Sequence, residues 1–295
     1  MHTSVLLNET IEFLNIKPDG FYVDGTLGLG GHAEAIAKKL GPHGRLLGLD
    51  VDHQNLAAAE RRLQPLGNLT RTRQVNFRGL QGALAAEGWK GADGMLFDLG
   101  VASSQLEDPA RGLSFQADGP LDMRLDPSTG KTALQVLHTV RERELEEALR
   151  EFGEERNAKR LSRSILFELS AGRLKTTGEL ARLCERVVGR HGKTHPATRV
   201  FLMLRCMVND EMGALDDLLA AAPACLNLRG RLAIISFHSL EDRRVKEKFR
   251  SLAKSPSGEK RFSLVTKKPI GPSSDEMREN PRSRSAKMRV LERVA

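Results

Sequence analysis

Short apolar runs alternate along the chain with segments whose apolar residues recur at helical spacing. The apolar runs are typical of buried strands and lie at residues 21–24, 45–50, 69–75, 95–99 and 231–237. Glycines follow the first run, and helices are expected at 32–40 and 55–63. Strands that alternate with helices predict an α/β fold with a doubly wound sheet of parallel strands.

The stretch between the fourth and fifth runs is far too long for a single crossover connection. Its apolar residues keep helical spacing at 134–152, 158–170, 179–190 and 197–222. We therefore expect a helical insert at 109–210, with 1–108 and 211–295 forming one discontinuous domain. Ligands bind at the C-terminal edge of such sheets, so the insert is expected to cover the site and contact the substrate. A side domain that only stabilises the fold is the alternative.

The chain after the fifth run predicts one more helix and two closing strands. The helix is charged and amphipathic at 240–252, and the strands are expected at 262–265 and 287–294. Ser239 has the position of an N-cap, with Asp242 three residues further on in a box-like arrangement.

A glycine-rich loop follows Asp24 and ends at His32, with the sequence Gly25-Thr26-Leu27-Gly28-Leu29-Gly30-Gly31 between them. Glycine allows the backbone to turn sharply and to approach a ligand, and the next helix presents unpaired N–H groups. Asp50 ends the second strand, 22 residues after Gly28, where an acid commonly accepts hydrogen bonds from ribose hydroxyls.

Three interpretations of this loop stay open on spacing alone. A dinucleotide would use Gly28, Gly30 and Ala33, S-adenosylmethionine would use the same turn without a pyrophosphate, and a turn without any ligand is the third. Asp24 favours S-adenosylmethionine, because a buried carboxylate needs a partner such as the ammonium group of that cofactor. The loop also lacks the Lys-Ser/Thr ending of a P-loop.

Polar residues follow the fourth strand and are expected to face the same crevice. Asp98 could orient a cofactor amine or accept a proton-bearing group, and Ser103, Ser104 and Gln105 offer short polar groups. A role in capping the next turn is equally compatible with their spacing. Arg199 lies in the first turn of a predicted helix, which suggests either an anionic partner or a salt bridge.

Among the histidines, His32 has the positional case for ligand contact. His238 ends the fifth strand and could touch a substrate, although a structural role is slightly favoured. The other histidines show no metal-ligand spacing, and the three cysteines, Cys184, Cys206 and Cys225, have no CxxC spacing. We therefore predict no metal, no disulfide framework and a reducing, cytoplasmic location.

The net charge of +8 in this 295-residue chain is confined to one region. Residues 241–295 hold 16 Lys and Arg against 8 Asp and Glu, whereas residues 1–240 hold 30 of each sign. Arg282, Arg284 and Lys287 lie in a stretch that suits a phosphate backbone better than a membrane, because it has no apolar face. No apolar run is long enough for a membrane span, no signal peptide is expected, and aromatics at 4% argue against an aromatic RNA-binding sheet.

The motifs together resemble the bacterial ribosomal small-subunit methyltransferase H family, also called MraW. The resemblance is carried by segments that span nearly the whole chain in order: 2–7, 24–32, 48–52, 98–105, 111–115, 120–124, 152–156, 194–199, 236–243 and 280–287. Two residues depart from the family pattern, Ala102 in place of Ser and Ser104 in place of Pro.

The resemblance implies a class I S-adenosylmethionine-dependent methyltransferase fold with a helical, substrate-recognising insert. It implies methylation of the exocyclic N4 of a cytidine in the decoding region of 16S ribosomal RNA, within the small ribosomal subunit. It places cofactor contacts on Gly30, Gly31, His32, Asp50, Phe77, Asp98 and Gln105. Asp98, Ser103 and Ser104 are the candidate acceptors for the target amine, without an assigned general base.

Two other functional classes remain as alternatives at this point. A nicotinamide-dependent oxidoreductase would need only the glycine loop. A non-catalytic RNA-binding assembly factor would use the basic tail. The sequence leaves the oligomeric state open, with a homodimer as one option.

Overall fold

The computed structural model describes residues 4–190, 194–254 and 260–295, so His2 and Thr3 of the N-terminal matching segment lie outside the described residues. Internal contacts divide the chain into two compact units. The first unit combines residues 1–100 with 213–295, and the second comprises residues 101–212. The sequence-based division places the insert at 109–210.

The first unit is built on one seven-stranded sheet with the strand order β3-β2-β1-β4-β5-β7-β6. Its strands are β1 (Phe21–Asp24), β2 (Arg45–Asp50), β3 (Thr70–Gln74), β4 (Ala92–Asp98), β5 (Leu226–Ser236), β6 (Phe262–Leu264) and β7 (Lys287–Arg293). The first five run parallel, and β7 is antiparallel to both of its neighbours. The predicted doubly wound α/β fold of the class I methyltransferase type is confirmed.

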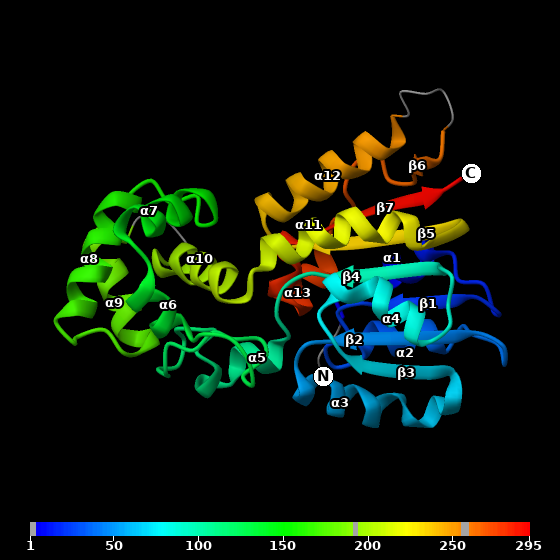
Figure 1. The fold of residues 1–295 in the computed structure, drawn as a ribbon, viewed down its shortest axis with the longest axis horizontal. Coiled ribbons are helices and arrows are strands. Elements are labelled where there is room, and N and C mark those ends of the chain that lie inside the picture. Colours follow the sequence, from blue (N-terminus) through cyan, green and yellow to red (C-terminus); the bar gives the residue numbers. More distant parts are fainter. Residues whose placement is uncertain (1–3, 191–193, 255–259) are drawn as a thin grey trace. The chain divides into compact units, whose positions relative to one another are not determined.

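Helices cover both faces of this sheet (Figure 1). One apolar core lies beneath α1 (Leu7–Leu14), α2 (Gly31–Ala37) and α3 (His53–Leu63). The other lies beneath α4 (Leu80–Ala86), α11 (Glu211–Ala221) and α12 (Ser239–Ala253). Side chains alternate between the two cores along the central strands, as Leu96 does against Met95 and Phe97, and burial on both faces explains their continuous apolar runs.

The second unit is helical and has its own apolar core. Its helices are α5 (Ser103–Glu107), α6 (Ala133–Thr139), α7 (Glu142–Glu151), α8 (Ala158–Ser170), α9 (Thr177–Val188) and α10 (Ala197–Asn209). Two predicted helices are each divided. Residues 134–152 break at Val140, which has extended backbone angles, and residues 197–222 break at Asp210, which is left-handed with φ 49°.

The start of α12 corrects one sequence-based expectation. The N-cap is His238 rather than Ser239, and the carboxylate that closes the cap belongs to Glu241 rather than to Asp242. Glu241 accepts hydrogen bonds from the backbone N–H groups of Phe237 (2.9 Å) and His238 (3.3 Å). Asp242 instead forms a buried ion pair with Arg289 on β7, in which its two carboxylate oxygens accept two hydrogen bonds from the guanidinium group. Helix α13 (Ser274–Glu279) lies in a stretch with no predicted helix.

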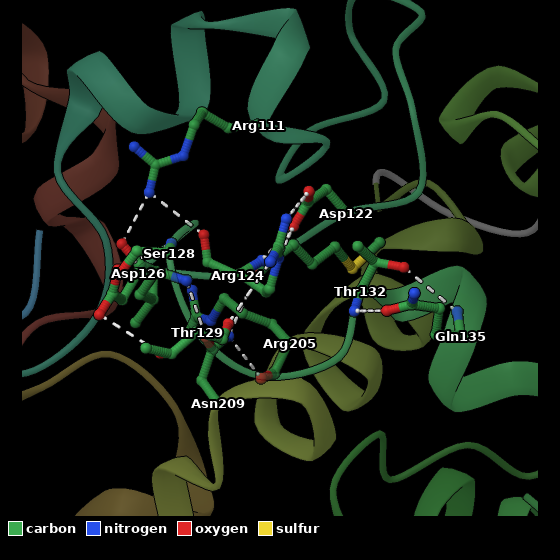
Figure 2. Close-up of polar contacts among 12 residues, drawn as sticks. Arg111, Asp122, Arg124, Asp126, Ser128, Thr129, Thr132, Gln135, Arg205 and Asn209 are labelled. Atoms are coloured by element: carbon green, nitrogen blue, oxygen red, sulfur yellow. Dashed lines mark hydrogen bonds and ion pairs between the residues drawn. The ribbon is translucent and has the colours of Figure 1, made fainter. Parts of the chain in front are cut away.

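A polar network holds the long loop between α5 and α6 of the second unit (Figure 2). The Arg111 guanidinium donates to the backbone carbonyls of Arg124 and Leu125, and Arg124 pairs with Asp122 through two hydrogen bonds. The Asn209 side chain donates to the Met123 carbonyl at 2.9 Å and accepts from the Leu125 N–H at 2.8 Å. Two matching segments, 111–115 and 120–124, thus supply much of the scaffold of this loop.

Within the described ranges, no helix combines the length and the apolar character needed to cross a membrane.

Replacement of Asn209 by Ala should destabilise the second unit, because it leaves the Met123 carbonyl and the Leu125 N–H without partners. We expect a loss of about 1–3 kcal/mol in the free energy of unfolding, measured by urea denaturation. The exposed Thr198 on α10 provides the control variant, Thr198→Ala, with an expected change below about 0.5 kcal/mol. Equal stability of the two variants would contradict the supporting role of Asn209.

Candidate active site

The glycine loop connects the end of β1 to the start of α2 and is closely packed. Gly30 is the N-cap of α2 and has a left-handed backbone with φ 78°, a conformation that costs other residues free energy. A Cβ atom on Gly31 would overlap the Ser4 hydroxyl, and one on Gly25 would overlap the Phe97 ring. Glycine is therefore required here both by conformation and by the closeness of neighbouring residues.

Asp50 ends β2 beside this loop, and its carboxylate is fixed by hydrogen bonds. Oδ2 accepts from the Gly28 N–H at 2.7 Å and from the Asn55 side chain at 3.3 Å, while Oδ1 accepts from the Asp52 N–H at 2.8 Å. Burial raises the pKa of Asp50 above its ordinary value. The carboxylate thus occupies the position predicted from spacing, and its contact with ribose hydroxyls remains a prediction.

Asp24 ends β1 and is almost completely buried, with 1% of its surface exposed. Its Oδ1 accepts from the Thr26 N–H at 3.3 Å, whereas its Oδ2 finds no hydrogen-bond partner among the residues that the structure describes. Burial raises the pKa of Asp24 to about 7; the backbone hydrogen bond from Thr26 opposes this rise, and the nearby charge of Asp50 adds to it to a smaller extent. Such a carboxyl group is poised to receive a cationic hydrogen-bond donor.

Asp98 ends β4 at the same edge of the sheet, where Asp24 is in register with Leu96. Oδ1 of Asp98 is buried and has no hydrogen-bond partner within the described part of the chain. Burial raises the pKa of Asp98 well above its ordinary value, and the charges of Asp24, Glu241 and Glu276 raise it further. Several carboxyl groups therefore share this edge of the first unit, and together they favour a positively charged ligand.

His32 links this edge to the N-terminal segment. Its Nε2 lies 2.9 Å from the Val5 carbonyl oxygen, and because a carbonyl only accepts, Nε2 carries the hydrogen. Its Nδ1 lies 3.8 Å from Oδ2 of Asp98. The same segment is held at its next residue, where the Leu6 N–H donates to Glu276 on α13 at 2.8 Å. His32 thus contacts protein on both sides, and a cofactor contact remains a prediction.

Phe77 follows β3 and packs edge to face on Phe97, with ring centroids 5.9 Å apart. Its position came from the family resemblance, since one aromatic residue after a strand carries no recognisable spacing signal. Glu241 and Glu276 were also not predicted as part of this edge. These two residues reach the edge of the sheet near Asp98 only through contacts between segments that are distant in the sequence.

Ser103, Ser104 and Gln105 belong to the second unit and form the first turn of α5. The Gln105 side chain is buried, and its Oε1 accepts from the Ala102 N–H at 2.9 Å. This is the capping role that the sequence left open as an alternative. Their contacts with cofactor or substrate stay predictions. No three His, Cys, Asp or Glu side chains in the described ranges are grouped so that they could hold a metal ion.

The predicted RNA-contacting cations have different surroundings. Arg199 is half exposed and lies 3.5 Å from the buried Glu155, so the salt-bridge interpretation of its position holds. Arg282 and Arg284 are exposed on a 3₁₀ turn at Pro281–Ser285. Lys287 is about half exposed and lies 3.7 Å from Asp242. RNA contact by all four remains a prediction.

The pKa of about 7 at Asp24 predicts that binding of S-adenosylhomocysteine depends on pH. A cationic amine binds the ionised carboxylate, so affinity should rise about tenfold per pH unit up to about pH 7 and then level off. Calorimetry in buffers of different ionisation enthalpy should also detect proton release on binding near pH 7. Affinity that is constant between about pH 5.5 and 7.5 would contradict this role.

Asp24→Asn is the matched variant, because it keeps the shape and removes the titration. The folded pKa of Asp24 lies above its unfolded value, so its contribution to stability falls as pH rises from about 4 to about 7. Above pH 7 the unliganded variant should therefore be more stable than the parent by about 2–4 kcal/mol, while its affinity for S-adenosylhomocysteine is lost.

Comparison with known proteins places this site in a family. The model of the MraW methylase family matches residues 1–294. A protein of Syntrophus aciditrophicus named "Ribosomal RNA small subunit methyltransferase H" is 43% identical over 99% of this chain and 98% of its own length. Proteins of the same name from Koribacter versatilis and Heliobacterium modesticaldum are 44% and 42% identical, each over 99% of this chain and over 94% and 98% of their own lengths. The chain therefore belongs to the MraW methylase family.

Proposed function

We propose that this protein is an S-adenosylmethionine-dependent ribosomal RNA (cytosine-N4-)-methyltransferase that acts on the decoding region of 16S ribosomal RNA in the small subunit. The observation that carries the proposal is a pair of buried carboxyl oxygens, Asp24 Oδ2 and Asp98 Oδ1, that have no hydrogen-bond partner among the described residues and lie beside the glycine loop. The names of the relatives support a substrate in the small subunit. The choice of cytidine N4 comes from the family resemblance.

The residues of the first unit fit the cofactor. Asp24 would receive the ammonium group, the backbone at Gly30 and Gly31 would approach the ligand closely, and Asp50 would accept from the ribose hydroxyls. Phe77, which is partly exposed after β3, would pack on the adenine. When bound, the cofactor supplies an electrophilic methyl group on a positively charged sulfur.

The charge of the site argues against a nicotinamide dinucleotide. A dinucleotide would bring a doubly charged pyrophosphate to the glycine loop, next to the buried carboxylate of Asp24. Burial weakens solvent screening, so repulsion between these anions would be strong. A cationic cofactor would instead be attracted by the buried carboxylates, and its positive charge would offset the free-energy cost of burying them.

The target amine needs acceptors as well as alignment. The lone pair of cytidine N4 is delocalised into the ring, and acceptors for its N–H groups favour a more nucleophilic nitrogen as positive charge develops. Asp98 is such an acceptor in the first unit, and Ser103 and Ser104 are candidates in the second. The base must also leave its stack to present N4 to these groups.

A transfer assay tests the proposal directly. Purified protein, small ribosomal subunits and cofactor with a tritiated methyl group should give labelled RNA, and nucleoside analysis should identify N4-methylcytidine. Label on another nucleoside would refute the choice of N4. RNA binding without any transfer would instead favour the assembly-factor alternative. Asp50→Ala should weaken cofactor binding, measured by calorimetry.

The exposed cations near the C-terminus would bind the RNA backbone. Replacement of Arg282, Arg284 and Lys287 together by Gln should weaken RNA binding. It should also reduce the slope of log K against log salt by about 2, because a protein that contacts fewer phosphates releases fewer counterions when it binds. Affinity for S-adenosylhomocysteine should not change.

A matched control removes the same charge elsewhere in the first unit. Lys39, Arg61 and Arg71 are all exposed, and their combined replacement by Gln also lowers the net charge by three. This control should leave the salt slope close to that of the parent. An equal slope for both triple variants would show that RNA contact does not depend on the 282–287 segment.

A further inference from the structure

His238 is a histidine with buried ring nitrogens that the proposed function does not use. It follows β5 and precedes α12, and only 13% of its side chain is exposed. Its Nδ1 is buried and has no hydrogen-bond partner within the described part of the chain, whereas Nε2 lies 3.0 Å from a carboxylate oxygen of Glu241. Buried polar atoms are normally hydrogen-bonded, so a buried Nδ1 without a partner needs an explanation.

Glu241 holds this imidazole in one orientation. The carboxylate is itself fixed, since its Oε2 accepts from the Phe237 and His238 backbone N–H groups and only 3% of the side chain is exposed. Its other oxygen, Oε1, lies 3.0 Å from Nε2 of His238. A carboxylate beside Nε2 favours the tautomer with hydrogen on Nε2, which leaves the lone pair on Nδ1.

The pair lies at the same edge of the sheet as the carboxyl cluster. β5 is the neighbour of β4, Asp98 is in register with Ile235, and the Leu99 N–H donates to the Ile235 carbonyl at 2.9 Å. Glu241 is close enough to Asp98 for its charge to raise the pKa of that carboxyl group. Within the first unit, Glu241 therefore contacts His238 and also influences Asp98.

We propose that Nδ1 of His238 accepts the proton that cytidine N4 loses during methyl transfer, and that Glu241 positions the imidazole for it. This inference rests on the proposed function. The N4 lone pair forms the new N–C bond, and the electron pair of the broken C–S bond stays on sulfur. N4 then carries a positive charge and two hydrogens, one of which passes as a proton to Nδ1.

The surrounding charges suit a neutral base in this position. Asp24 would be engaged by the cationic cofactor and Asp98 by an N–H group of the target amine, whereas the His238 imidazole is free of both tasks. The Glu241 carboxylate, 3.0 Å from Nε2, would balance the charge that the imidazole takes up with the proton.

Chemical rescue tests the proposal. With saturating cofactor, His238→Ala should lower the single-turnover rate of methyl transfer by about 10²–10⁴-fold, and added imidazole should restore part of it. Pyrazole, which has a similar shape but is a much weaker base, should not. Affinity for S-adenosylhomocysteine should stay within a factor of two or so of the parent value, since the imidazole does not hold the cofactor. A parental rate in His238→Ala, or equal rescue by pyrazole and imidazole, would overturn the proposal.

His43→Ala is the matched control. His43 is exposed in the turn before β2, at the N-terminal end of the strands, so its removal should leave the rate unchanged. If His238→Ala does not fold, His238→Gln replaces it, because this side chain keeps polar volume but cannot take up a proton at neutral pH. Loss of transfer in folded His238→Gln supports the proposal, and retention overturns it.

Nitrogen-15 NMR of the imidazole provides a readout that is independent of activity. The parent protein should show His238 with hydrogen on Nε2, and Glu241→Gln should shift the population toward the other tautomer and slow transfer. A parent with hydrogen on Nδ1 would overturn the proposal. The two hypotheses also fail differently: if the parent forms no N4-methylcytidine, the proposed function is wrong, whereas an active parent with an equally active His238→Ala refutes this inference alone.

Discussion

The burial of carboxyl groups at the C-terminal edge of the parallel sheet is the constraint on which the site depends. Asp24 and Asp98 end neighbouring strands, and each has an oxygen with no hydrogen-bond partner among the described residues. Removal of a carboxylate from water costs free energy unless a cation or donor replaces the water. The fold stabilises this arrangement with two apolar cores, one on each face of the sheet. The unfavourable charge is thus concentrated where a cationic ligand can neutralise it.

The elements that could be predicted from the sequence are those with local signals. Apolar runs located the strands, and the glycines and Asp50 located the loop, because these patterns depend on residues close together in the chain. The break at Asp210 was not predictable, since apolar residues keep helical spacing on both sides of it. Glu276 reached the site through its bond to the Leu6 N–H, a contact across 270 positions that no local pattern reveals. Phe77 required the family resemblance.

The basic tail shows how a charge count changes once partners are known. Arg289 is buried and forms two hydrogen bonds with Asp242, so this cation ties β7 to α12 and does not face solvent. Lys287 lies near the same carboxylate but is about half exposed. Arg282 and Arg284 remain exposed on the turn between α13 and β7. Among these four cations, Arg289 therefore has a structural role inside the protein, whereas Arg282, Arg284 and Lys287 are exposed and suit contact with RNA.

The path of the positive charge during the proposed reaction explains why the edge of the sheet carries both carboxylates and a neutral base. In the proposed reaction one positive charge begins on the cofactor, moves to N4 with the methyl group and leaves as a proton. Fixed carboxylates can balance this charge at each stage without rearrangement, which is how preorganised groups lower a barrier. A carboxylate that took up the proton itself would lose its charge, so a neutral acceptor leaves the balancing carboxylates intact. An imidazole held by a buried glutamate has that property, and Glu241, which contacts His238, also influences Asp98.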